Sequence, residues 1–190
     1  MKNKRIIRPR VVVDTNIFLN SWIDGLGSCN YILELISINS LRLLFSQDTI
    51  GEFLYVAKNY CISNMSSDKS RIPFMQNLAE MFYLAISVDT SETLCPKIND
   101  IYDEMFLKCA IEGKANYLIS NDFRSGMHVL GINDKNDIKI VSSQEFIKTY
   151  EELLVGYILV LLVLQRIKIE SYKLNGENST LLCIYIEIII

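Results

Sequence analysis

Short apolar runs alternate with stretches of helical periodicity through most of the chain, and this alternation limits the folds that the chain can adopt. Five of the runs have the length of buried strands: residues 11–13, 41–45, 84–88, 117–120 and 138–141. Parallel strands need long crossover connections, which are usually helices. We therefore expect an α/β fold with three layers, α/β/α, around a central, mainly parallel sheet.

Apolar residues at helical spacing predict the connections between these strands. Helices are expected at residues 28–38, 48–60, 72–83, 98–112 and 142–153. Asp48 and Thr49 are candidate N-caps of the second helix, and Gly113 is a candidate stop for the fourth. Ser142 and Glu145 have the spacing of a capping box, which predicts that the last helix begins there.

Acidic residues stand where these elements should meet. Asp14 and Asp122 directly follow two predicted strands, and Glu52 lies near the start of a helix that follows a third. Asp100 and Asp103 are three residues apart, so their carboxylates share one face of a helix. Because open parallel sheets bind ligands beyond the carboxyl ends of their strands, we expect all five acids to face one crevice.

Carboxylates that converge without basic partners repel one another, and a bound hard cation relieves that repulsion. Mg²⁺ and Mn²⁺ prefer oxygen ligands and keep several waters, which leaves room for a substrate phosphate. Such an ion lowers the pKa of a bound water and neutralises charge on phosphoryl oxygens. The spacing of the acids therefore predicts an acidic crevice suited to a hard cation such as Mg²⁺ or Mn²⁺.

Four segments resemble the motifs of a known family. They are VVVDTN at residues 11–16, DTIGEF at 48–53, DIYDEMFLKCA at 100–110 and ANYLISND at 115–122. In order and spacing they resemble the PIN-domain ribonucleases, particularly the toxin components of bacterial toxin-antitoxin pairs. The resemblance covers residues 11 to about 150, and its most specific part joins an acid-led helix, a glycine stop, a strand and a terminal acid.

The resemblance implies a metal-dependent endoribonuclease with RNA as substrate, a cognate antitoxin as partner, and a homodimer as an open possibility. It also implies the acids that hold the metal and act in catalysis: Asp14, Glu52, Asp103 and Asp122. Asn16 or Thr15 would support Asp14, and Asp100 corresponds to a position that is often acidic. Asn121 and Arg124 flank Asp122 and have the chemistry to contact RNA, but an arginine in a loop is more often solvated, so neither is assigned.

Other functions fit the same residues less well. A phosphatase with Asp14 as nucleophile usually has a second aspartate where Asn16 stands, and a phosphoacceptor domain wants a lysine where Ser142 and Ser143 follow the last strand. The single histidine, His128, excludes HExxH zinc chemistry. The main alternative is a catalytically inactive PIN-like module that binds protein or RNA.

The distribution of charge and cysteine bears on location and partners. The net charge is −3, yet residues 1–10 hold five basic side chains and no acid. We treat this segment as a basic arm that either touches a polyanion or is merely solvated. Five cysteines without a CxxC pair or a secretory leader predict a reduced, cytoplasmic protein.

Residues 153–190 form an apolar extension beyond a nuclease-like domain at residues 11–152. The run at residues 153–164 is twelve residues long, short of the roughly 18 to 20 that span a bilayer, so no stable membrane insertion is expected. Its β-branched content and the turn-like segment at residues 174–179 suggest a β-hairpin.

Overall fold

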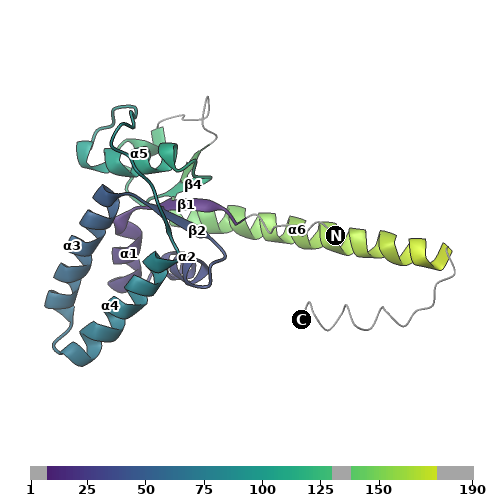
Figure 1. Ribbon diagram of the computed structural model, residues 1–190, viewed down its shortest axis with the longest axis horizontal. Helices are drawn as coiled ribbons and strands as arrows, with labels where there is room; N and C mark the ends of the chain where they lie inside the picture. The colour runs from purple at the N-terminus through teal and green to yellow at the C-terminus, as the bar shows by residue number, and fades with distance from the viewer. Residues whose placement is uncertain (1–7, 130–137, 175–190) are drawn as a thin grey trace. The chain divides into compact units, whose positions relative to one another are not determined.

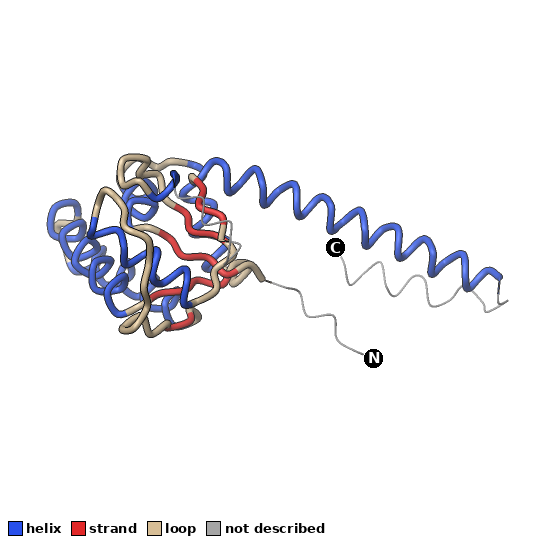
Figure 2. The backbone as a smooth tube through the Cα atoms, turned by 90° about the horizontal axis from the view of Figure 1, so that it is seen from above, coloured by secondary structure: helices blue, strands red, loops and turns tan. Residues whose placement is uncertain are grey.

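The computed structural model describes residues 8–129 and 138–174. The chain divides into two compact units, Met1–Ile147 and Lys148–Ile190. The first unit contains the sheet, whose strands run side by side in Figure 2. It also contains all five of the acids singled out from the sequence.

The central sheet has five parallel strands, as expected. They are β1 (Arg10–Val13), β2 (Arg42–Phe45), β3 (Ile86–Ser87), β4 (Tyr117–Ile119) and β5 (Lys139–Val141), in the order β3-β2-β1-β4-β5. The chain builds outward from β1 to β3 and then returns to add β4 on the other side of β1. The switch point of the topology therefore lies between β1 and β4, where Val13 pairs with Ile119.

Helices cover both faces of this sheet, which confirms the three-layer α/β/α fold (Figure 1). The described helices are α1 (Thr15–Trp22), α2 (Gly27–Ser37), α3 (Gln47–Asn64), α4 (Asp68–Tyr83), α5 (Glu104–Glu112) and α6 (Ser143–Leu174), with short 3₁₀ turns η1 (Ile101–Asp103) and η2 (Met127–Val129). Helix α6 belongs to the first unit only as far as Ile147. On the α5 side, Phe106 and Leu107 pack with Val12 and Leu118 in the main core. Because β residues alternate between faces, Val11 and Val13 turn toward the other layer.

Several helix boundaries differ from the sequence-based prediction. Helix α1 was not predicted, and it follows Asp14 immediately. Helix α3 is capped by Ser46, whose side chain forms a capping box with Thr49, rather than by Asp48 or Thr49. The helix expected at residues 98–112 is interrupted, with a 3₁₀ turn ahead of α5.

Gly113 ends α5, but not by adopting a left-handed backbone. Its φ is −73°, and Lys114 takes the positive φ of 50°. A side chain at residue 113 would meet Leu44 Cδ1 at 2.7 Å. The glycine therefore serves close packing of α5 against β2.

The hairpin predicted within residues 153–190 is wrong for the part that the structure describes. Helix α6 begins at the predicted capping box, where Ser142 N and Oγ both donate to Glu145 Oε2 at 2.8 Å, and it continues to Leu174. An uninterrupted apolar run has no period that separates strand from helix, and here the preceding helix continues through it. Residues 175–190 lie outside the described part. Within the described part, no helix is both long enough and apolar enough to cross a membrane.

Candidate metal centre at the carboxyl edge of the sheet

Asp14 is the buried centre of the site. It follows β1, its side chain caps α1, and only 4% of its surface is exposed. Oδ1 accepts from Asn16 N at 3.1 Å, whereas Oδ2 accepts from Asn16 Nδ2 and Ser120 Oγ, both at 2.6 Å. The Asp14 pKa is raised to about 6, first by burial and also by the charges of Glu52 and Asp122, against the lowering effect of the hydrogen bonds from Ser120 and Asn16.

Ser120 is a site residue that the sequence analysis missed. It is fully buried at the end of β4, and its Oγ donates to Asp14 Oδ2 while accepting from Asn16 Nδ2 at 3.1 Å and from Asp122 N at 3.0 Å. The available signal was a polar residue at the end of a buried strand, two residues before Asp122. The hydroxyl thus links β1 and β4 at the switch point.

Glu52 enters the site from α3. The helix begins at Gln47, so Glu52 lies in the second turn rather than the first. Burial raises the Glu52 pKa, a hydrogen bond to the Thr15 side chain lowers it, and the charges of Asp103 and Asp100 raise it. The neighbouring Phe53 holds the helix in place, since its ring packs on Phe18 of α1 at 4.6 Å.

Asp103 and Asp100 differ in their surroundings. Asp103, where η1 passes into α5, is half-buried, and its pKa is raised to about 7 by burial and then by the charges of Asp14, Asp100 and Asp122. Asp100 is exposed and caps η1, accepting from Tyr102 N at 2.9 Å. Asp103 N donates to the carbonyl oxygen of Asp100 at 3.2 Å, so the two acids belong to one 3₁₀ turn. Asp103 is the more buried of the two, and the charges of Asp14 and Asp122 act on it.

The loop after β4 fixes Asp122 and joins it to the segment that carries Asp100. Asp122 Oδ1 accepts from Arg124 N at 2.7 Å, and the carbonyl oxygen of Ser125 accepts from Asn99 N at 2.9 Å and Asp100 N at 3.3 Å. Gly126 has a φ of 86°, and a Cβ there would lie 3.1 Å from Asn99 Nδ2. This contact explains how acids far apart in the sequence reach one edge of the sheet.

Asn16 and Asn121 form a second layer behind the acids. Asn16 Oδ1 accepts from Asn121 N at 3.1 Å, and Asn121 Oδ1 accepts from Ser143 N at 2.9 Å. This arrangement bears out the supporting position expected for Asn16. His128 contacts the carbonyl oxygen of Ser120 through Nε2 at 3.0 Å and stacks on Phe123 at 4.4 Å, so it holds the loop.

The chemistry of the candidate ligands suits a hard divalent cation. All the candidate ligands are carboxylate oxygens, and neighbouring carboxylates raise the pKa values of Asp14, Glu52 and Asp103. No described lysine, arginine or histidine forms a salt bridge with the candidate ligands. In their metal-free positions, no three of the described histidine, cysteine, aspartate or glutamate side chains are grouped closely enough to hold one ion. Ion binding would therefore require side-chain adjustment around the fixed Asp14.

The domain is an open parallel α/β fold, and its carboxylates lie at the topological switch point. Folds of this class bind ligands at the carboxyl edge of the sheet. Residues 10–124 match the family model described as PIN domain, and the chain belongs to this family. PIN domains are generally nucleases.

Two known proteins show how far the similarity extends. An uncharacterized protein of Methanocaldococcus jannaschii, MJ1680, is 24% identical over 159 residues, which cover 81% of this chain and 99% of the relative. A crystal structure of VapBC2 from Rickettsia felis, bound to a DNA fragment from their promoter, matches with 15% identity and a TM-score of 0.43, covering 70% of this chain and 98% of that one. A likeness at that level carries no argument about function.

Proposed function

We propose that this protein is a metal-dependent endoribonuclease whose ligands are Asp14, Glu52, Asp103 and Asp122. The observation that carries the proposal is the mutual effect of these acids: burial and neighbouring carboxylates raise the pKa values of three of them in one site. Such an arrangement is unfavourable to the empty protein, and functional sites are where such perturbations concentrate.

Mg²⁺ is the proposed ion, with Mn²⁺ as its substitute. When bound, it would supply a lowered water pKa and neutralise charge that develops on the phosphoryl oxygens. The chain's own residues set the geometry. Ser120 and Asn16 hold the Asp14 carboxylate in one orientation, while the backbone of Arg124 orients Asp122.

RNA as substrate and a role as the toxin of a toxin-antitoxin pair are the finer parts of the proposal. They are supported by the four motifs that resemble PIN-domain toxins. A cognate antitoxin is then the expected protein partner, a homodimer stays a prediction, and the nuclease domain is placed at residues 11–152. The proposed cytoplasmic location is supported by cysteines 29, 61, 95 and 109, which are all free thiols.

The first test is cleavage of total RNA by purified protein with Mg²⁺, with Mn²⁺ and with EDTA. Asp14→Asn is the matched control, since it keeps the side-chain shape and removes the charge, and it excludes a contaminating nuclease. We expect cleavage that requires metal and is lost in the variant. No cleavage from well-folded protein in any condition would favour the inactive binding module.

The toxin role needs a separate test in cells. Induced expression in a bacterial host is expected to arrest growth with the wild-type chain and not with Asp14→Asn at matched protein levels. Cleavage in vitro without arrest would support the ribonuclease and contradict the toxin role.

A further inference from the structure

An open pocket lies directly beside the acidic site and shares Asp122 with it. Its volume is about 590 Å³, within the range of small-ligand sites. The lining residues are Asn99, Asp100, Ile101, Tyr102, Asp122, Arg124 and Ser125. Two of the candidate acids thus form part of its wall.

The pocket combines an exposed aromatic ring with a cationic side chain. Tyr102 is 80% exposed and Ile101 69%, so both present apolar surface to solvent within the pocket. Arg124 is exposed and makes no salt bridge with a described acid. Aromatic faces stack on unpaired bases of any identity, and arginine pairs with phosphate.

The backbone around the pocket is held firmly. Tyr102 N donates to Asp100 Oδ1 at 2.9 Å, and the carbonyl oxygen of Arg124 accepts from Asn99 Nδ2 at 3.4 Å. The Ser125 carbonyl accepts from the backbone of Asn99 and Asp100. The ring and the guanidinium are therefore carried by two segments that are fastened to each other and to the acidic site.

We propose that this pocket seats one unpaired nucleotide of single-stranded RNA next to the scissile phosphate, with its base stacked on Tyr102 and its phosphate bound by Arg124. The inference rests on the proposed ribonuclease function. A base in a duplex is already stacked and paired and cannot enter, so the pocket would restrict the enzyme to single strands.

The test measures binding of a short single-stranded RNA by fluorescence anisotropy, with Ca²⁺ in place of Mg²⁺ to supply an ion for the same oxygen ligands. Tyr102→Ala is expected to weaken binding roughly tenfold or more, as for other single base–aromatic stacks, and Tyr102→Phe to bind as wild type. Tyr83→Ala is the matched control, because Tyr83 is 87% exposed and lies outside the pocket.

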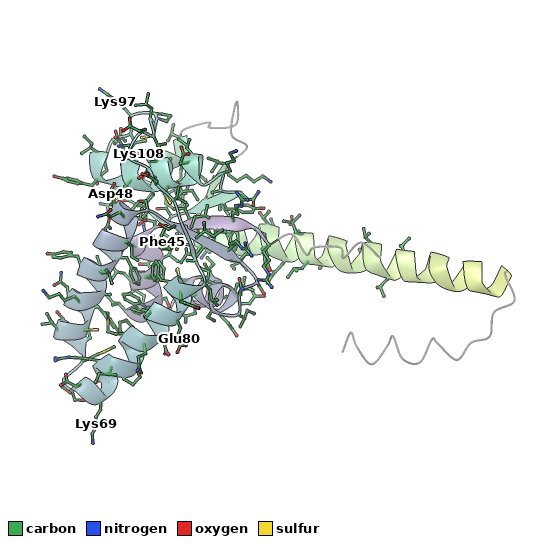
Figure 3. The ribbon with its side chains drawn as sticks, viewed as in Figure 1. Phe45, Asp48, Lys69, Glu80, Lys97 and Lys108 are labelled. Atoms are coloured by element: carbon green, nitrogen blue, oxygen red, sulfur yellow. The ribbon has the colours of Figure 1, made fainter. Side chains whose placement is uncertain are left out.

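Arg124 is tested through the salt dependence of the same binding. Arg124→Ala is expected to lower the slope of log K against log salt by about 0.7, the value for one phosphate contact on a single strand. Lys69→Ala is the control, because Figure 3 places Lys69 on α4 at the opposite end of the domain from Lys97, which precedes the pocket segment. Its slope should stay that of the wild type.

The outcomes separate this inference from the nuclease proposal. Tyr102-dependent binding without cleavage would support the pocket and contradict the nuclease. If Tyr102→Ala cleaves RNA with the KM of the wild type, the nuclease proposal is supported and the role of the pocket is contradicted. Wild-type protein that binds duplex RNA as tightly as single strands, or binds no single strand, would overturn the inference.

Discussion

The Asp14 carboxylate works against folding in the absence of metal. The unfolded chain has an ordinary pKa near 3.8 at this residue, and the folded protein raises it to about 6. The Asp103 pKa, raised to about 7, changes in the same direction. The native state therefore binds more protons than the unfolded state between about pH 4 and pH 7, and stability decreases as pH rises through that window.

Metal-free protein should therefore lose stability between pH 4 and pH 7. For Asp14 the loss is on the order of 2–3 kcal/mol, since one pKa unit corresponds to about 1.4 kcal/mol. Asp14→Asn should flatten the dependence and raise stability at pH 7. Urea unfolding in EDTA across this range measures both. A wild-type stability that rises from pH 4 to pH 7 would contradict the assigned burial.

The two acids near η1 should differ in importance. Asp103→Asn is expected to abolish cleavage, because Asp103 is half-buried among the other acids, whereas Asp100→Asn should retain a substantial part of it. Cleavage of one RNA by both variants at equal concentration tests this. Equal losses would show that Asp100 is also a ligand.

Ser120 should matter for both folding and metal affinity. Ser120→Ala removes the hydrogen bond to Asp14 Oδ2 and leaves the donors of Asn16 and Asp122 with one acceptor fewer. We expect a loss of about 1–3 kcal/mol in stability and a 10- to 100-fold loss of metal affinity. Calorimetric Mn²⁺ titration measures the affinity. Ser66→Ala, at an exposed position between α3 and α4, is the control and should change neither.

At the scale of elements, the site depends on how the loop after β4 meets the segment before α5. The backbone of Asn99 and Asp100 donates to Ser125, and Gly126 lies against Asn99. These contacts join two segments that belong to different crossovers of the sheet. A change in the loop should therefore displace the acids that the other segment carries.

Gly126→Ala tests this coupling. The positive φ and the 3.1 Å approach to Asn99 should cost about 1–3 kcal/mol in stability, and cleavage should fall as the segment of Asp100 and Asp103 shifts. Gly51→Ala is the contrasting change, because nothing lies within 4 Å of its Cβ position and α3 should gain about 0.5–1 kcal/mol. Thermal unfolding and cleavage assays compare them. Equal stability of the two variants would exclude the strain argument.

At the scale of the whole molecule, metal binding and folding should be coupled. An ion that binds the native site and not the unfolded chain stabilises the fold in proportion to the logarithm of its concentration. Because the metal-free carboxylates repel one another, the gain should be largest near pH 8, where all of them are charged.

We expect Mn²⁺ to raise Tm at pH 8 in a concentration-dependent manner, with EDTA abolishing the effect. Asp103→Asn should start from an equal or higher Tm in EDTA, because it relieves repulsion, and should show a smaller rise. Differential scanning fluorimetry measures both curves. An equal metal-induced rise in the variant would place the ion elsewhere.

Residues 11–13 and 117–120 could be recognised as strands from the sequence. A short run of apolar and β-branched residues indicates a buried strand without any information about distant parts of the chain. Asp14 and Asp122 follow these runs directly, so their place at one edge follows from the parallel arrangement. The same local logic predicted the capping box that begins α6. It did not reveal α1, which is only eight residues long and begins with two polar residues, Thr15 and Asn16.

By itself, the sequence determined the alternating α/β class, the parallel sheet and the residue types at its carboxyl edge, because each depends on periodicity within a few neighbouring positions. Only the tertiary structure decided that Ser120 binds Asp14, that the side chain of Asp103 is more buried than that of Asp100, and that Tyr102 borders a pocket with Arg124. Two of these features bring together residues that are distant in the chain. The third is a difference in burial between two residues that are close in the chain. They arise from strand order and loop packing, for which no local pattern carries a signal.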